Sequence, residues 1–148
     1  MVYLIREKCF NLKGGVDMRR GFTLVELIVV ITIIAILATI AIPQFMRMQE
    51  RAKGSAAKAK LDIIRKAEGI YRSLYDIYTN NFDALDDEVP EAAQSRLNDD
   101  DWNFTLTNTT STFTATATRR RGTYAGRTIT IDQDGNIGGN HPSVGGSW

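Results

Sequence analysis

The sequence has 148 residues, with 18 Lys and Arg against 17 Asp and Glu, so its formal net charge is +1. This length leaves room for one domain, and a nearly neutral chain is not the polycation that binds nucleic acid by charge alone. The single cysteine, Cys9, excludes an intramolecular disulfide, so a folded domain must depend on packing and hydrogen bonds.

Residues 1–21 form a basic leader. They contain five basic residues against two acidic ones, and Arg19 and Arg20 lie just before a long apolar run. Basic residues that flank a membrane span favour the cytoplasmic side, so these leader charges predict that the C-terminal part of the chain lies outside the membrane. Met1 and Met18 are both candidate start residues, and the function is the same for either one.

The apolar run from Phe22 to Ile42 is 21 residues long and contains one charged residue, Glu26. As a helix with a rise of about 1.5 Å per residue it spans about 31 Å, which is enough to cross a bilayer core. The run is longer than the apolar region of an ordinary signal peptide. A plain anchor does not explain the carboxylate, because a charge inside a membrane helix is costly and usually marks a function. We therefore predict a transmembrane helix over residues 22–42.

Around this junction the chain reads Arg19-Arg20-Gly21-Phe22-Thr23-Leu24-Val25-Glu26-Leu27, and the apolar run closes at Ile42-Pro43. This order closely resembles the prepilin signature that type IV pilins share with the pseudopilins of type II secretion systems. The resemblance is specific from Arg19 to Pro43 and weakens beyond it. It implies that a membrane-embedded prepilin peptidase cuts between Gly21 and Phe22, and that Phe22 is then N-methylated.

The chemistry of the junction agrees with this resemblance. Glycine is the smallest residue, so Gly21 lets a protease approach the backbone closely. After the cut Phe22 carries an ammonium group, which lies in an apolar core if parallel helices form a fibre. Glu26 of a neighbouring subunit can neutralise that charge, which removes the cost of burying it unpaired and also sets the axial register. The assembly role of Glu26 is therefore a hypothesis with a physical basis.

Residues 43–78 are predicted to continue the helix as an amphipathic segment. Pro43 is expected to kink the helix or melt it locally, and Gly54 offers a second weak point. The basic residues of this segment favour a solvated face over a site for anionic lipid or DNA.

Apolar residues recur in this segment at steps of three and four, the pattern of one apolar helix stripe. The stripe consists of Ala52, Ala56, Ala59, Ile63, Ala67, Ile70, Leu74 and Ile77. We expect its early alanines to suit close contact between helices in a fibre. The larger Ile70, Tyr71 and Leu74 are expected to dock the rest of the domain.

The remaining chain predicts a connection, a small sheet and a tail. Residues 79–101 have the composition of a polar connecting loop with a short helical turn. Residues 102–137 predict an antiparallel β-meander, because three segments alternate apolar and polar residues: Trp102–Thr107, Thr112–Ala117 and Arg127–Asp132. Residues 138–148 are Gly-rich and predict a flexible tail.

The predicted fold class is therefore α+β and pilin-like. A long N-terminal helix, transmembrane in its first half and amphipathic in its second, is packed by a small three-stranded antiparallel sheet.

Candidate sites in the predicted sheet are weak. The run Asp132-Gln133-Asp134-Gly135-Asn136 resembles the start of a calcium loop but lacks the distal glutamate, so a tight turn is the better interpretation. Calcium binding at Asp99, Asp100 and Asp101 is left open as an alternative, although nothing in the sequence requires it. We expect no metal and no cofactor. The run Arg119-Arg120-Arg121 could touch nucleic acid, but a solvated loop is favoured and nucleic acid is not expected as a partner. No catalytic constellation is found, so the chain is expected to be an enzyme's substrate and not an enzyme.

The sequence thus predicts a structural subunit of a type IV pilus-like filament. The subunit is expected in the bacterial inner membrane as a single-pass protein with its C-terminus outside, and later in an extracellular or periplasmic filament. The resemblance implies four kinds of partner: prepilin peptidase, other copies or related pilins, an assembly platform protein and an ATPase. Two alternatives stay open, a pseudopilin of a type II secretion system and a single-pass membrane-anchored binding module that does not polymerise.

Overall fold

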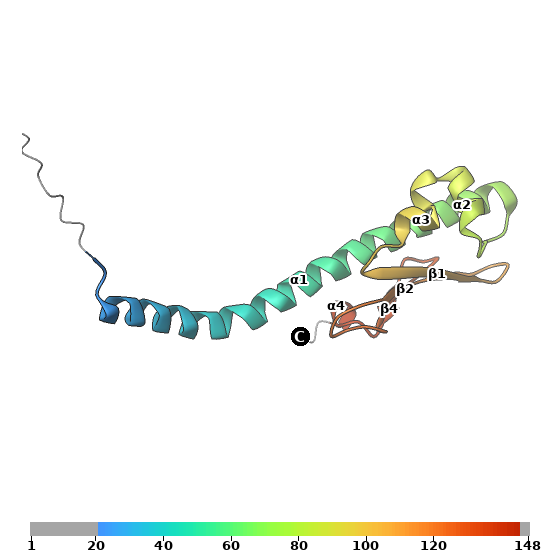
Figure 1. The fold of residues 1–148 in the computed structure, drawn as a ribbon. Coiled ribbons are helices and arrows are strands. Elements are labelled where there is room, and N and C mark those ends of the chain that lie inside the picture. Colours follow the sequence, from blue (N-terminus) through green and yellow to red (C-terminus); the bar gives the residue numbers. More distant parts are fainter. Residues whose placement is uncertain (1–20, 146–148) are drawn as a thin grey trace, which may run out of the picture. The chain divides into compact units, whose positions relative to one another are not determined.

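The structure is a computed structural model that describes residues 21–145 (Figure 1). Most of the predicted leader, with Arg19 and Arg20, therefore lies outside the described residues. The chain forms two compact units, one that ends at Thr39 and one that begins at Ile40. We call the second unit the head.

One helix, α1, runs from Leu24 to Tyr75 and contains 52 residues. It continues through Pro43, as predicted, while the expected kink at this proline stays a prediction. The helix ends where Asp76 takes a left-handed backbone conformation, with φ of 60°, and donates its N–H to the carbonyl of Arg72 at 2.8 Å. A left-handed residue is a common way to end a helix, so α1 stops somewhat before residue 78.

In the first unit, the described part of α1 has no covering layer of its own chain. The large apolar side chains from Phe22 to Leu37 are 46–83% exposed. By length and composition, α1 is able to cross a membrane. The predicted span therefore leaves an apolar surface that lipid or another chain has to cover.

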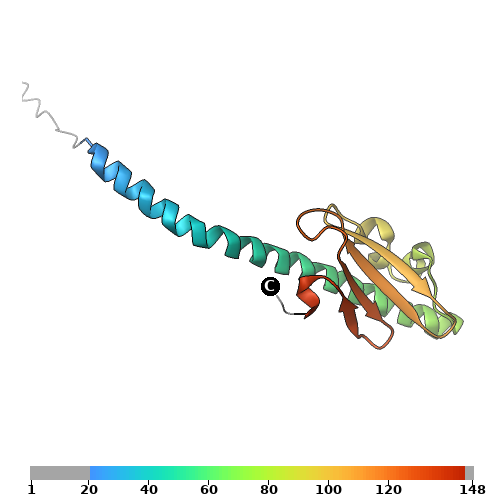
Figure 2. The same cartoon turned by 90° about the horizontal axis from the view of Figure 1, so that it is seen from below.

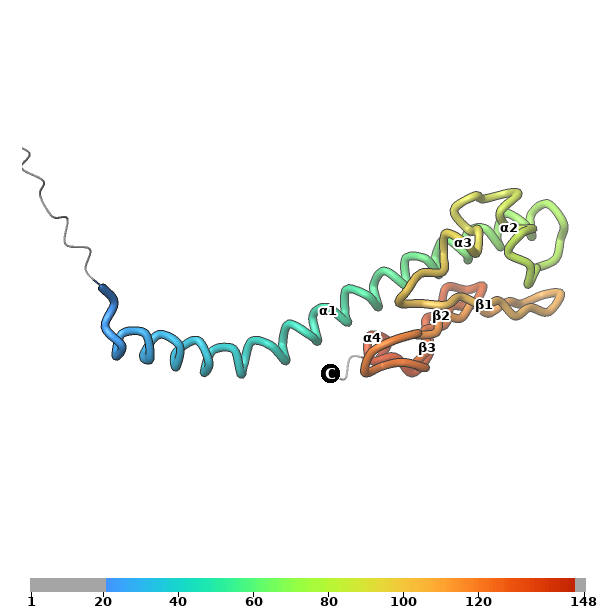
Figure 3. Tube along the Cα trace, viewed as in Figure 1, coloured from blue at the N-terminus to red at the C-terminus, as the bar shows by residue number. Residues whose placement is uncertain are grey.

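In the head, four antiparallel strands form one sheet in the order β1-β2-β3-β4 (Figures 1 and 3). The strands are β1 (Trp102–Asn108), β2 (Phe113–Arg119), β3 (Thr128–Asp132) and β4 (Ile137–Gly139). The predicted three-stranded meander is confirmed, and β4 is an addition to it. Because β4 has three residues, two of them glycine, it gives no alternating pattern that sequence could reveal.

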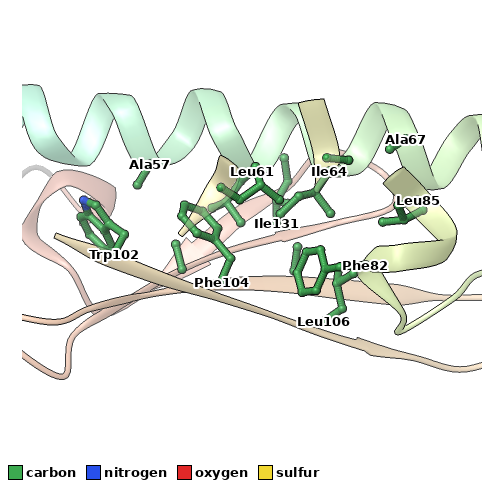
Figure 4. Packing of buried hydrophobic residues seen from close by; sticks show 14 of the residues in the cluster. Ala57, Leu61, Ile64, Ala67, Phe82, Leu85, Trp102, Phe104, Leu106 and Ile131 are labelled. Carbon is green, nitrogen blue, oxygen red and sulfur yellow. The ribbon is translucent and has the colours of Figure 1, made fainter. Parts of the chain in front are cut away.

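The sheet packs against the head part of α1, as the turned view in Figure 2 shows. Buried residues alternate with exposed ones along β1 and with half-buried ones along β3, so one face of each strand faces the helix. Figure 4 shows Leu61 and Ile64 of α1 and Phe104 of β1 among the side chains that fill the space between the helix and the sheet. This single cluster is the core of the head.

The face of α1 that packs on the sheet differs from the predicted stripe. Ala57, Leu61 and Ile64 are fully buried, whereas Ile70 and Leu74 are 44% and 58% exposed. Of the predicted stripe only Ala67 is buried. The prediction that Ile70, Tyr71 and Leu74 dock the head was therefore wrong for Ile70 and Leu74, whereas Tyr71 is partly buried and packs against the core. Sequence spacing alone cannot tell which of two neighbouring apolar stripes of α1 meets the sheet.

The connection between α1 and the sheet is more helical than predicted. It contains α2 (Phe82–Glu88), the short 3-10 helix η1 (Pro90–Ala92) and α3 (Gln94–Leu97). The side chain of Asn81 caps α2 by accepting the N–H of Asp83 at 3.0 Å. Phe82 and Leu85 are buried in the core, so this segment is pinned to the head.

Residues 138–145 depart from the predicted flexible tail, whose last residues, 146–148, lie outside the described part of the chain. Residues 137–139 pair with β3, and α4 (Pro142–Gly145) follows them. His141 is buried, and Val144 packs against the core, so the chain returns to α1 (Figure 3). Gly54 makes this contact possible. Any larger residue would carry a Cβ atom at 2.5 Å from Ser143 Oγ, which is too close.

Two glycines of α1 give opposite predictions for the same substitution. A Cβ atom at Gly69 would meet nothing within 4 Å, whereas one at Gly54 would also meet Ser143 Cβ at 2.7 Å. Alanine is better than glycine inside a helix, so we expect Gly69→Ala to raise the free energy of unfolding by about 1 kcal/mol. We expect Gly54→Ala to lower it, because α4 has to move away from α1. Chemical denaturation of the full chain in detergent, followed by near-UV circular dichroism, measures both, and equal stabilisation would contradict the contact.

Candidate functional site

The processing junction lies just before the first turn of α1. Gly21 is exposed, a Cβ atom added to it would meet nothing within 4 Å, and Phe22 is also exposed. Neither residue belongs to the helix, which begins at Leu24. The bond between Gly21 and Phe22 is thus open to approach, as a peptidase requires.

Glu26 closes a capping box at the start of α1. Its Oε2 accepts hydrogen bonds from the N–H and from the hydroxyl of Thr23, both at 2.8 Å, while Thr23 Oγ1 accepts the N–H of Glu26 at 3.2 Å. This reciprocal pair satisfies N–H groups that the first turn of a helix leaves unbonded. The signal Thr-x-x-Glu was present in the sequence, but the cap role of Thr23 was not anticipated.

The capping box leaves room for a second role of the same carboxylate. Both bonds from Thr23 end on Oε2, and within residues 21–145 no bond engages Oε1 of Glu26. An ammonium group of another chain can therefore bind Oε1 without breaking the cap. The geometry is compatible with the predicted assembly role, which stays a prediction.

A polar cluster lies between α1, the sheet and the C-terminal segment of the head. We call it the Arg119 cluster: Glu50, Asp101, Arg119 and His141. The buried guanidinium of Arg119 donates to both carboxylate oxygens of Glu50, at 2.7 and 3.2 Å, and to the backbone oxygen of Asp101 at 2.8 Å. His141 Nε2 lies 3.2 Å from Glu50 Oε1. The cluster ties the end of β2 and the C-terminal segment to one helix residue.

The charges of this cluster keep its carboxylates ionised. Burial alone would raise the pKa of Glu50, but the hydrogen bonds and charges of Arg119 and His141 lower it below its ordinary value. Asp101 follows the same pattern: burial is outweighed by Arg119 and Lys53, which lower its pKa. Burial lowers the pKa of His141 despite the opposing effect of Glu50. The predicted solvated arginine loop is therefore wrong for Arg119.

The two following arginines are exposed, and each bonds to the chain. Arg120 donates to the carbonyl of Asp99 at 2.9 Å, and Arg121 pairs with Asp100 at 3.0 Å. Asp99 in turn pairs with Lys60 at 2.7 Å. The aspartates that were left open for calcium are thus engaged with cations of their own chain.

The second calcium candidate is a turn. Asp132 Oδ1 accepts the N–H groups of Asp134 and Asn136, at 3.0 and 2.8 Å, and Gly135 has φ of 86°. This is the tight turn that the sequence favoured, and it joins β3 to β4. Within residues 21–145 no three His, Cys, Asp or Glu side chains form a group that could hold a metal ion.

Ser143, His141 and Glu50 lie in a row and are the residue types of a catalytic triad of nucleophile, base and acid. Ser143 Oγ lies 2.9 Å from His141 Nδ1, and His141 Nε2 faces Glu50. Ser143 Oγ lies against Gly54 of α1, where an added Cβ atom would meet it at 2.5 Å, so the helix covers one side of this hydroxyl. The row therefore holds the C-terminal segment in place.

Glu68 is a buried carboxyl group that sequence analysis did not single out. Its Oε2 accepts the N–H of Thr79 at 3.1 Å, while its Oε1 has no hydrogen-bond partner among the described residues. Burial raises the pKa of Glu68 to about 7, although the bond from Thr79 opposes this shift. The signal was its position on the core-facing stripe with Leu61 and Ile64.

Comparisons with known proteins give a consistent result. Residues 17–42 match the family described as the prokaryotic N-terminal methylation motif. The type IV major pilin protein of Myxococcus xanthus is 48% identical over 61 residues, which are 41% of this chain and 28% of that protein. The type IV wide pilus major component of Thermus thermophilus is 41% identical over 66 residues, 45% of this chain and 50% of that protein.

A secretion protein is similar as well. The type II secretion system core protein G of Pseudomonas aeruginosa is 40% identical over 52 residues, which are 35% of this chain and 37% of that protein. The chain thus spans half the length or less of these relatives.

The buried Glu68 predicts that the head loses stability as the pH rises. Because its pKa is raised from 4.5 to about 7, the folded state keeps a proton that the unfolded state releases in this range. Glu68 should therefore lower the free energy of unfolding by about 3 kcal/mol between pH 4.5 and pH 8, while His141, whose pKa is lowered, offsets part of this fall. Glu68→Gln should remove this fall, whereas Asp62→Asn on the same helix should keep it. Denaturation curves at several pH values measure the effect, and a fall that persists in Glu68→Gln would contradict it.

Proposed function

We propose that this chain, which belongs to the type IV pilin and pseudopilin family through its N-terminal segment, is a structural subunit of a helical filament. The observation that carries this proposal is the apolar surface of residues 22–42, which the described part of the chain leaves exposed and which contains one carboxylate, Glu26. A membrane covers this surface before assembly, and the same helices of other subunits cover it afterwards.

Processing comes first in the proposed sequence of events. Arg19 and Arg20 hold the leader on the cytoplasmic side, and a prepilin peptidase cuts the accessible bond between Gly21 and Phe22. Phe22 is then methylated, which leaves a positively charged N-terminus. The match of residues 17–42 to the methylation motif supports these steps.

Assembly follows from the burial of that charge. When the helix leaves lipid for the fibre core, the ammonium group of Phe22 needs a partner, and Oε1 of Glu26 on a neighbour offers one. The neighbour's Oε2 keeps its bonds to Thr23, so the helix start stays capped. One stagger of the helices brings the two charges together, which fixes the axial register.

Within this class the subunit serves in a pilus or in a pseudopilus. The relatives include two pilus proteins and a type II secretion protein, and the similarity to each covers part of the chain. The Asp132 turn lacks the distal ligand of a calcium loop, which favours a pilus. The role is structural and not enzymatic, and the platform protein, its ATPase, the bacterial inner membrane and an external C-terminus belong to this proposal.

Intact mass and N-terminal peptide mapping of the chain from its own host test the processing step. We expect a mature chain that begins at Phe22 and carries one added methyl group. A chain that still contains Arg20 and Gly21, or one cut near Ala41, would leave a plain anchor or an exported head instead.

Glu26→Ala tests assembly separately from processing. Removing one partner of a buried ion pair costs about 3–5 kcal/mol, so we expect processed subunits but no fibres in electron micrographs. Thr23→Val is the matched control, since it removes the hydroxyl of the capping box and keeps the carboxylate. Fibres that form normally from Glu26→Ala, or that are lost equally in Thr23→Val, would contradict the pairing role.

A further inference from the structure

The two ends of α1 within the head carry opposite charge. Residues 73–95 contain six acidic residues and no Lys or Arg, whereas residues 43–53 contain Arg47, Arg51 and Lys53 against a single acid, Glu50. Glu50 is engaged by Arg119, and Lys53 pairs with Asp101 at 3.1 Å, so Arg47 is the basic residue of this end on which the docking below depends. The acidic end therefore attracts a basic partner, and the basic end attracts an acidic one.

The acidic end forms a surface that combines charge with exposed apolar groups. Asp83, Asp86 and Asp87 lie at spacings of three and four on one face of α2 and are exposed, while Phe82 and Leu85 on the other face are buried. Within residues 21–145 these three aspartates form no salt bridge.

Exposed apolar side chains lie at the same end of the head. Leu74, Tyr75 and Ile77 are exposed, and the hydroxyl of Tyr75 bonds to Glu88 Oε1 at 3.3 Å, which brings the end of α2 to the end of α1. We call Leu74, Tyr75, Ile77 and the three aspartates the distal surface.

The basic end also combines charge with exposed apolar groups. Phe45, Met46 and Met48 are 58–68% exposed, and the exposed Arg47 lies among them. Beside them is a hollow of about 240 Å³, lined by Met46, Arg47 and Lys53 of α1 and by Arg119 and Tyr124 of the sheet side. We call Met46, Arg47 and this hollow, which both residues line, the proximal surface.

We propose that the distal surface of one copy docks on the proximal surface of another copy in the filament. The aspartates of α2 then face Arg47 at the rim of the hollow, and Leu74 and Ile77 pack against the exposed Met46. This inference rests on the proposed function, because it requires that copies assemble.

Charge decides which surfaces meet. Two distal surfaces would place the aspartates of α2 against each other, and two proximal surfaces would place arginines together, and like charges across an interface are costly. The attractive contact joins unlike surfaces, which lie about 40 Å apart along α1 at about 1.5 Å per residue. A contact between two different patches extends into an open helical filament when its rotation does not close a ring.

Anionic lipid is the rival occupant of the proximal surface. Arg47 and the apolar residues around it follow the predicted span, where headgroups could bind them. Lipid would leave the aspartates of α2 and the apolar side chains beside them without a partner. A second copy accounts for both surfaces, which is why we favour it.

Charge exchange in the full chain, expressed in its own host, tests the docking. We expect Asp87→Arg and Arg47→Asp each to lower the mass of sheared fibres by about tenfold, because each places like charges across the contact. The double variant with both changes should restore fibre mass. Asp134→Arg, which makes the same charge change at the exposed turn after β3, is the control and should leave fibre mass unchanged.

Disulfide trapping gives a second readout that a folding defect cannot imitate. The sequence has one cysteine, Cys9, which lies in the predicted leader, so the processed chain should contain none. Asp87→Cys combined with Arg47→Cys should give disulfide-linked ladders in fibres oxidised before denaturing electrophoresis. Each single variant alone should give none, since the two positions meet only each other.

The outcomes separate the docking from the proposed function. Normal fibres from both charge reversals, or no ladder from the double cysteine variant, would overturn the docking while fibres still form. A drop in the membrane-bound precursor of Arg47→Asp, with normal fibres from Asp87→Arg, would also overturn it and assign the proximal surface to lipid. If processed wild-type chains form no fibre, both the proposed function and the docking are contradicted.

Discussion

The exposed apolar surface of residues 22–42 is the constraint on which the rest of the chain depends. A helix of this composition cannot remain in water, and within the described residues no other element of the chain covers it. The chain is therefore incomplete as a monomer in solution and needs lipid or other copies. A single carboxylate, Glu26, is retained within that surface despite its cost, and the capping box with Thr23 shows how the helix start holds it.

The head uses the continuation of the same helix in a different way. Leu61 and Ile64 bury one stripe against the sheet, while a second stripe that includes Ile70 and Leu74 stays exposed. Polar contacts add to apolar ones at the end of the sheet nearest to residue 50, where the buried Arg119 binds Glu50 in a bidentate pair beside the buried Trp102. A buried pair of this kind contributes little net stability, but removing one partner is costly, so it acts mainly to specify one arrangement.

Sequence reasoning reached the helix, the meander and the fold class because each has a strong local signal: a long apolar run and alternating strands. It missed β4 because two of its three residues are glycine. It did not predict the burial of Glu68 and Arg119, because charged residues are expected on the surface and only the fold shows that these two are buried. Thr23 was within reach, since the Thr-x-x-Glu spacing is local. The choice between the two stripes of α1 was out of reach, because only the sheet decides which stripe it covers.

The contact between Gly54 and Ser143 determines where the chain leaves the head. It brings α4 to the middle of α1, whereas the turn between β1 and β2 lies near the end of α1, where Arg72 donates to the carbonyl of Ser111 at 3.1 Å. A fluorescent protein or affinity tag attached beyond α4 would therefore leave the head beside Gly54, away from the turn between β1 and β2. A short epitope inserted near Ser111, which is exposed, would project from the opposite end of the head.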